Sequence, residues 1–176
     1  MQVDIVQLPE PAQPGPEHRT TMAPQQFKLV TEWHVKAPLE RVWAELITPE
    51  DWPRWWRAVK HVVVLHEGDA DGVGSERRMT WSTALPYELE FDMRATRIEP
   101  MSLIEGRACG QLEGFGRWTL RREGRGTYVR YDWRVKLSRP WMRALAPLLR
   151  PAFIWNHRMV MAWGYEGLCR RLGVAR

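Results

Sequence analysis

The residues best suited to chemistry in this sequence are an arginine, two tyrosines and an adjacent asparagine–histidine pair. Arg77 lies in the stretch SERRMTW, where alternation places it on the same face as Met79 and Trp81. An arginine on an apolar face needs a partner. That partner is either an acid such as Glu90 or the carboxylate, phenolate or carbonyl oxygen of a ligand, and the sequence leaves both open.

Asn156 and His157 occupy a segment with helical periodicity, in which His157 precedes Val160 by three residues. A histidine on an apolar face is more often a hydrogen-bonded core residue than a catalyst, but a neutral imidazole is also able to act as acid or base on an enolisable substrate. Tyr87 and Tyr131 would add hydroxyl donors. The candidate catalytic residues are therefore Arg77, Tyr131, Asn156 and His157.

Strand alternation surrounds these groups with large apolar side chains, because every second residue of a strand points to the same face. Gly106, Gly114 and Gly116 share this face, which indicates either a bulge or bend in the strand or room for a ligand. The predicted ligand-binding residues are Arg77, Met79, Trp81, Tyr87, Phe91, Trp118, Tyr131, Trp133, Asn156, His157 and Val160.

Periodicity and turn residues predict the elements that position these side chains. A strand comes first, then two short helices broken by prolines, six further strands and one long helix that begins after Pro147 and Pro151. The strands are expected at 27–35, 59–67, 75–83, 87–98, 103–109, 112–122 and 127–137, and the long helix at 153–172.

This order of elements resembles the START-like superfamily, which includes Bet v 1-type and polyketide cyclase/dehydrase proteins. The similar stretches are APLERVWAELITPEDWPRWW, DGVGSERRMTW, GQLEGFGRWTL and NHRMVMAWGYEGLCRRL. The resemblance implies an α+β helix-grip fold, with a curved seven-stranded antiparallel sheet, two short helices and a long C-terminal helix enclosing a hydrophobic cavity. We expect this domain at residues 27–173, after a proline-rich flexible arm at 1–26 and before a tail at 174–176.

Three of the 11 tryptophans occur in the stretch DWPRWW. We interpret Trp52, Trp55 and Trp56 first as large rings that fill the core where the short helices meet the sheet and the long helix. Contact with a membrane is the second interpretation. Stacking on bases is the least favoured, because aromatic residues are not interleaved with Lys and Arg, and no nucleic-acid partner is expected.

Charge is concentrated near the C-terminus. The net charge is +5, and residues 139–176 contain seven arginines against the single acid Glu166. Such a segment is either a solvated helix face or a surface attracted to phosphates, anionic lipid or an acidic ligand. Residues 139–155 also combine arginines with large apolar residues, so weak contact with an anionic membrane surface is an alternative there.

Several classes of protein lack support in the sequence. Motifs for zinc, dinucleotides, P-loop phosphates and nucleophilic serine are missing, so no metal or cofactor is expected. The two cysteines form no CxxC, the N-terminus does not resemble a secretion signal, and no apolar run would span a membrane, which together favour a cytoplasmic protein.

Three functions remain. The first is binding of a hydrophobic small molecule (a lipid, isoprenoid, quinone or polyketide-like compound) by a carrier or sensor. The second is a cofactor-independent polyketide cyclase, aromatase or dehydratase. The third is peripheral exchange of lipid at a membrane. The sequence shows no convincing acid–base pair, which ranks the enzyme second.

Overall fold

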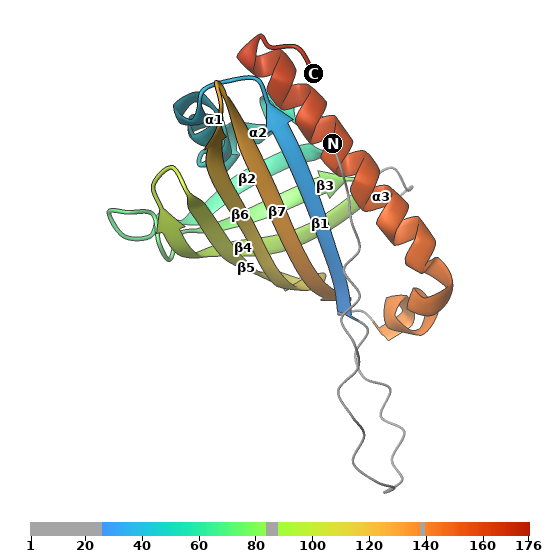
Figure 1. Ribbon diagram of the computed structural model, residues 1–176. Coiled ribbons are helices and arrows are strands. Elements are labelled where there is room, and N and C mark those ends of the chain that lie inside the picture. Colours follow the sequence, from blue (N-terminus) through green and yellow to red (C-terminus); the bar gives the residue numbers. More distant parts are fainter. Residues whose placement is uncertain (1–25, 84–87, 138–139) are drawn as a thin grey trace, which may run out of the picture.

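The structure is a computed structural model that describes residues 26–83, 88–137 and 140–176. The predicted order of strands and helices is confirmed, with one additional 3₁₀ turn between the two short helices (Figure 1). The elements are β1 (Gln26–Val35), α1 (Leu39–Leu46), η1 (Pro49–Asp51), α2 (Trp52–Trp55), β2 (Val59–His66), β3 (Glu76–Ser82), β4 (Glu88–Glu99), β5 (Leu103–Gly110), β6 (Leu112–Glu123), β7 (Gly126–Leu137) and α3 (Pro140–Leu172).

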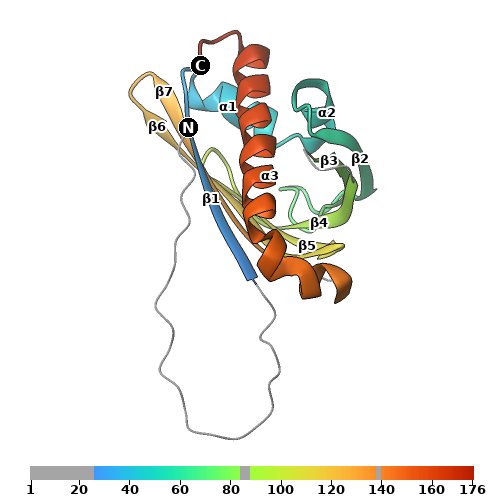
Figure 2. The same ribbon diagram turned by 90° about the vertical axis from the view of Figure 1, so that its right-hand side faces the viewer.

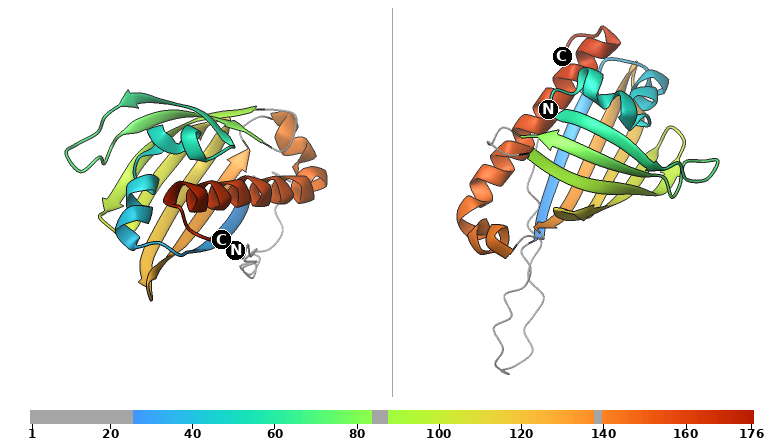
Figure 3. Two further views of the ribbon diagram at one scale, coloured as in Figure 1. Left: turned by 90° about the horizontal axis from the view of Figure 1, so that it is seen from above. Right: turned by 180° about the vertical axis from the view of Figure 1, so that it is seen from behind.

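The seven strands form one antiparallel sheet in the order β1-β7-β6-β5-β4-β3-β2, as the helix-grip fold requires. Register shifts interrupt the pairing of β2 with β3 and of β4 with β5, and such irregularities bend a sheet. The bent sheet curves around α3, while α1 and α2 lie at one end of the concave side (Figures 2 and 3).

Helix α3 is longer than the sequence predicts. It begins at Pro140 and continues through Pro147 and Pro151, so the predicted start at 153 is wrong. A proline inside a helix removes a hydrogen bond and bends the axis, but here the helix continues past both, and its first turns are bent away from the remainder (Figure 1). No helix in the described part of the chain is both long and apolar enough to cross a membrane.

Helix α1 follows from its apolar spacing. Leu39, Val42, Trp43 and Leu46 recur at helical intervals, and all four are buried. The face that they form covers one end of the sheet and leads the chain into η1 and α2. The short tail is also held in place, since Lys36 donates a hydrogen bond to the Arg176 carbonyl at 3.2 Å.

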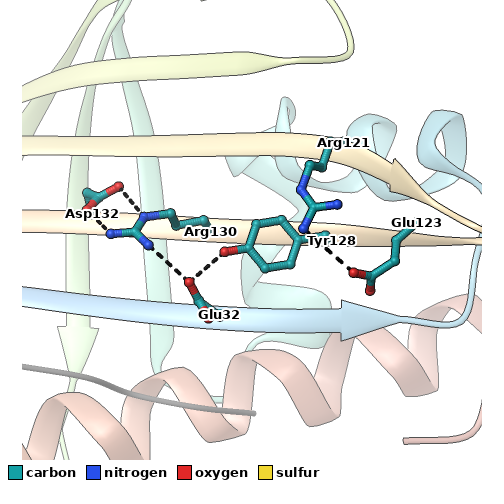
Figure 4. A network of polar contacts seen from close by, with 6 residues as sticks. All are labelled: Glu32, Arg121, Glu123, Tyr128, Arg130 and Asp132. Atoms are coloured by element: carbon teal, nitrogen blue, oxygen red, sulfur yellow. Dashed lines mark hydrogen bonds and ion pairs between the residues drawn. The ribbon is translucent and has the colours of Figure 1, made fainter.

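The sheet face opposite the helix carries a polar network that joins β1 to β7 (Figure 4). Glu32 accepts hydrogen bonds from the Tyr128 hydroxyl at 2.6 Å and from Arg130 at 3.0 Å. Arg130 also donates to both carboxylate oxygens of Asp132. Partial burial, followed by the hydrogen bond to Glu32, raises the pKa of Tyr128. These paired charges occupy outward-facing positions of the two strands, and the alternating apolar residues face the interior.

Helix α3 is anchored to α2 by two glycines and two tryptophans. A Cβ atom at Gly164 would lie 2.4 Å from the ring of Trp56, and one at Gly167 would lie 1.9 Å from the carbonyl oxygen of Trp55. The indole of Trp56 donates a hydrogen bond to the Val160 carbonyl at 2.9 Å. The glycines therefore let the helix approach the tryptophans more closely than any larger residue would allow.

We predict that Gly167→Ala destabilises the protein. Alanine improves helix propensity by about 1 kcal/mol, but overpacking against a backbone oxygen costs about 1–3 kcal/mol and the helix has to move. Chemical denaturation should give a lower free energy of unfolding for this variant. The exposed Arg170→Ala on the same helix is the control and should stay within about 0.5 kcal/mol of the wild type. Unchanged stability of Gly167→Ala would contradict the proposed contact.

Candidate functional site

A cavity of about 200 Å³ lies between the concave face of the sheet and α3. Its wall is largely apolar and is contributed by the sheet, α1, the segment that holds η1 and α2, and α3. Ten of the predicted ligand-binding residues lie on this wall: Arg77, Met79, Trp81, Phe91, Trp118, Tyr131, Trp133, Asn156, His157 and Val160. Tyr87, the eleventh, lies outside the described residues. Contact of these side chains with a ligand stays a prediction.

Stacked rings from β6 and β7 form the aromatic part of the wall. The rings of Trp118 and Tyr131 lie 4.1 Å apart between centroids with an interplanar angle of 24°, and Trp133 continues the stack at 5.8 Å from Tyr131. Cross-strand pairing places these three residues together, because Trp118 is opposite Tyr131 and Gly116 is opposite Trp133. The stack offers a flat apolar surface to anything that enters the cavity.

The three strand glycines lie in close contact with neighbouring atoms of the protein. A Cβ at Gly116 would lie 2.8 Å from the Tyr131 hydroxyl, and one at Gly114 would lie 2.1 Å from a backbone oxygen of β7. A Cβ at Gly106 would lie 2.9 Å from the sulfur of Met93, beside the irregularity between β4 and β5. The glycines therefore let neighbouring side chains and strands approach closely, while Gly106 and Gly116 also line the cavity, so the room that they leave for a ligand stays a prediction.

The tryptophans of DWPRWW are core residues, which confirms the first interpretation. Trp52, Trp55 and Trp56 are all buried. Trp52 and Trp56 also line the cavity, where Trp56 lies 5.1 Å from Trp81 and 6.2 Å from Trp118 between ring centroids. The same rings therefore close the core at one end and form the end wall of the cavity.

His157 faces the cavity from α3 and is hydrogen-bonded to β1. Its Nε2 lies 3.2 Å from the hydroxyl of Thr31, which is almost completely buried. The uncovered part of the ring lines the cavity rather than the outer surface, and the resulting loss of hydration lowers the pKa of His157 to about 4. The imidazole is therefore neutral near pH 7. Asn156, the preceding residue, is buried and lines the same wall.

Arg77 lies on the cavity wall, but its partner is not the acid that the sequence suggested. Its Nε donates to Glu50 of η1 at 2.7 Å, and another guanidinium nitrogen donates to the Ser75 hydroxyl at 2.6 Å. Glu90 was named as one example of an acidic partner, but it stands opposite Thr80 in the sheet, one residue out of phase with the inward face. Glu50 reaches Arg77 because η1 folds back over β3, and strand alternation alone does not predict this approach.

Sequence analysis did not identify the hydrogen-bond partners of His157 and Arg77, which are Thr31, Glu50 and Ser75. Thr31 belongs to the inward face of the first strand, so alternation places it correctly, but its partner on α3 is 126 positions away. Glu50 lies in the 3₁₀ turn η1, for which periodicity makes no prediction, and Ser75, expected at the start of the strand 75–83, directly precedes β3. Among the described residues, no group of three or more His, Cys, Asp or Glu side chains is arranged to hold a metal ion.

Comparison with known proteins places this architecture in a family. The family model for polyketide cyclase / dehydrase and lipid transport proteins matches residues 26–164. The chain belongs to this family. The match spans the whole sheet and most of α3, so it includes every described residue of the cavity wall. A search of the curated proteins found no match.

Solved structures share the fold at low identity, which confirms the predicted helix-grip architecture. A START superfamily protein from Mycobacterium smegmatis is 15% identical, with a TM-score of 0.68 over 83% of this chain and 97% of that chain. The Zhui aromatase/cyclase from Streptomyces sp. R1128 is 13% identical, with a TM-score of 0.66 over 85% and 94%. A protein from Thermus thermophilus is 18% identical, with a TM-score of 0.67 over 82% and 98%. These identities establish a common fold alone.

The low pKa of His157 predicts a specific dependence of stability on pH. An unfolded histidine takes up its proton near pH 6.5, whereas His157 in the folded protein does so only near pH 4. Between these values the unfolded chain binds more protons, so the free energy of unfolding should fall as the pH is lowered, by up to about 3 kcal/mol. Urea denaturation across this range measures the effect.

The control for this experiment is a second histidine. His157→Gln should remove this part of the pH dependence, whereas His61→Gln, at an exposed position on β2, should keep it. If the wild type and His157→Gln lose stability in parallel on acidification, the imidazole is not shielded from water as described.

Proposed function

We propose that this protein binds a hydrophobic small molecule in the cavity between the sheet and α3, and acts as a carrier or sensor of that molecule. The ligand classes are those with an extended apolar surface: a lipid, isoprenoid, quinone or polyketide-like compound. The observation that carries the proposal is an apolar cavity of about 200 Å³ with a stack of three aromatic rings on its wall. Concave, mostly apolar sites with a few placed polar groups are typical of small-molecule binding.

Polar groups on the wall are suited to orienting such a ligand. The amide of Asn156, the hydroxyl of Tyr131 and the neutral ring of His157 all line the cavity. Burial raises the pKa of Tyr131 far above its usual range, so its hydroxyl keeps its proton and remains a hydrogen-bond donor. These groups therefore support recognition of a carbonyl or hydroxyl oxygen on an otherwise apolar ligand.

A second candidate is a cofactor-independent polyketide cyclase, aromatase or dehydratase. The family's description and the presence of Arg77, Tyr131, Asn156 and His157 on one wall favour it. General acid–base catalysis is most effective when the pKa lies near the working pH. His157, with a pKa of about 4, and Tyr131, with a strongly raised pKa, both lie far from neutrality. Binding therefore ranks above catalysis.

Contact with an anionic membrane through residues 139–155 stays a prediction, as does a cytoplasmic location. Most side chains of this segment lie outside the described residues. Trp155 is 49% exposed on α3, and Arg150 and Arg158 are exposed on the same helix. An exposed tryptophan near cationic residues supports such contact, since rings of this kind favour the membrane interface.

We predict that filling the cavity abolishes binding of a hydrophobic probe. Ala95 lies on the cavity wall in β4, so Ala95→Phe would place a ring inside it. The uncharged fluorescent probe N-phenyl-1-naphthylamine should bind the wild type with enhanced emission, and binding to Ala95→Phe should weaken about tenfold or more, because the ligand no longer fits. Fluorescence titration measures both affinities.

The matched control is the adjacent residue of the same strand. Arg94 is exposed and alternates with Ala95, so Arg94→Phe adds the same ring outside the cavity and should retain binding. Circular dichroism in the near ultraviolet establishes that both variants keep the native tryptophan packing. Equal binding by the wild type and a folded Ala95→Phe, or lack of binding by the wild type, would refute the proposal.

A further inference from the structure

The titratable side chains on the cavity wall are few and carry no unbalanced charge. Among the described residues of the wall they are Arg77, Glu105, Tyr131 and His157. Glu105 forms an ion pair at 2.8 Å with Arg117, which lies on the neighbouring strand β6. Tyr131 keeps its proton, and His157 is neutral near pH 7, because both are shielded from water.

Arg77 is the one cation on this part of the wall, and its charge is already matched. The guanidinium donates to the Glu50 carboxylate at 2.7 Å, and the Ser75 hydroxyl occupies a second donor. The Arg77 side chain is 18% exposed and that of Glu50 34%, so neither is fully surrounded by water. The neighbouring acid, Asp51, is paired with Arg54 and is not available to replace Glu50.

Glu50 occupies its position because of the local turn. It is the central residue of η1, between Pro49, which lines the cavity, and Asp51. The turn brings the carboxylate over β3, 27 positions further along the chain. The pair therefore joins two elements that bound the same cavity, and its position does not depend on a ligand.

We propose that the cavity selects uncharged ligands, and that Glu50 determines this specificity by neutralising Arg77. This inference rests on the proposed binding function and deepens it. The favoured class contains ketones, quinones, alcohols and esters with apolar bodies. The disfavoured class contains carboxylates, sulfates and phosphates of the same shape.

The physical reason is the cost of an unpaired charge in a poorly hydrated cavity. A ligand carboxylate that enters loses its hydration, and the only cation on the described wall already has a carboxylate partner. To bind Arg77, the ligand carboxylate would have to displace Glu50, or share the guanidinium with Glu50 and be repelled by its negative charge. A ketone oxygen brings no such cost and needs only one donor.

The experiment compares two ligands of nearly equal shape, 2-acetylnaphthalene and 2-naphthoate, which differ in a methyl ketone against a carboxylate. Each competes with N-phenyl-1-naphthylamine on the wild type and on Glu50→Gln. The ketone should be the tighter ligand of the wild type. Since the substitution leaves Arg77 charged and unmatched beside the cavity, affinity for naphthoate should rise about tenfold, while affinity for the ketone changes by less than about twofold.

A control variant removes one negative charge, as Glu50→Gln does, but at a position that does not line the cavity. Asp92 is paired with Arg78, the residue after Arg77 on β3, whose side chain points to the other face. Asp92→Asn should therefore leave both affinities unchanged. The double variant Glu50→Gln with Arg77→Gln should lose the gain in naphthoate binding, which ties the effect to the guanidinium.

The possible outcomes distinguish a failure of this inference from a failure of the proposed binding function. If the wild type binds the ketone and Glu50→Gln, folded by near-ultraviolet circular dichroism, gains no affinity for naphthoate, the role of Glu50 is wrong and the binding function stands. If the wild type binds both ligands equally, the role of Glu50 is likewise wrong and the binding function stands, and this result needs no variant. If neither ligand nor the fluorescent probe binds the wild type, the proposed function itself fails.

Discussion

The contact between α3 and the Trp55–Trp56 pair is the constraint on which the rest of the structure depends. Gly164 and Gly167 remove the side chains that would hold the helix away, and the indole of Trp56 is hydrogen-bonded to the helix backbone. The C-terminal half of the helix is thereby packed tightly against α2. The cavity lies beside this contact, since Trp56 and Val160 both line its wall.

The cavity wall combines aromatic rings with polar groups, of which His157 and Arg77 have partners within the protein, whereas the buried indole nitrogen of Trp81 has no hydrogen-bond partner among the described residues. Thr31 is hydrogen-bonded to His157, and Glu50 and Ser75 satisfy Arg77. The Thr31–His157 and Glu50–Arg77 contacts join residues 126 and 27 positions apart, so they also fix the positions of α3 and η1 relative to the sheet. A buried polar group without a partner would be costly, which explains why the wall can be hydrophobic and still hold these residues.

The electrostatic state of the wall distinguishes the proposed functions. A catalyst acting by proton transfer near neutrality needs a group poised to gain or lose a proton there. His157 and Tyr131 are each shifted toward the neutral form by burial, and Arg77 is neutralised by an ion pair. These charge states favour binding of an apolar molecule over proton transfer, and the family's description accommodates this role through lipid transport.

Much of the fold could be predicted from the sequence because it depends on local patterns. Alternation determines which face of each strand is apolar, and this placed Met79, Phe91, Trp118 and Trp133 in the interior. The order of elements and the family motifs then determined the helix-grip architecture. The start of α3 was mispredicted, since a proline signals a break but the surrounding helix is able to continue with a bend.

The tertiary structure alone decided the partners. Glu50 rather than Glu90 pairs with Arg77, because a three-residue turn returns the chain over β3, and nothing in the periodicity of either segment encodes that approach. The hydrogen bond from β1 to His157 likewise joins residues 126 positions apart. The sequence by itself determined which side chains face inward. The packing of α3 and η1 on the sheet decided which of these side chains meet, and hence the charge of the cavity wall and the space left for a ligand. That packing is set by the sum of many contacts between residues distant in sequence.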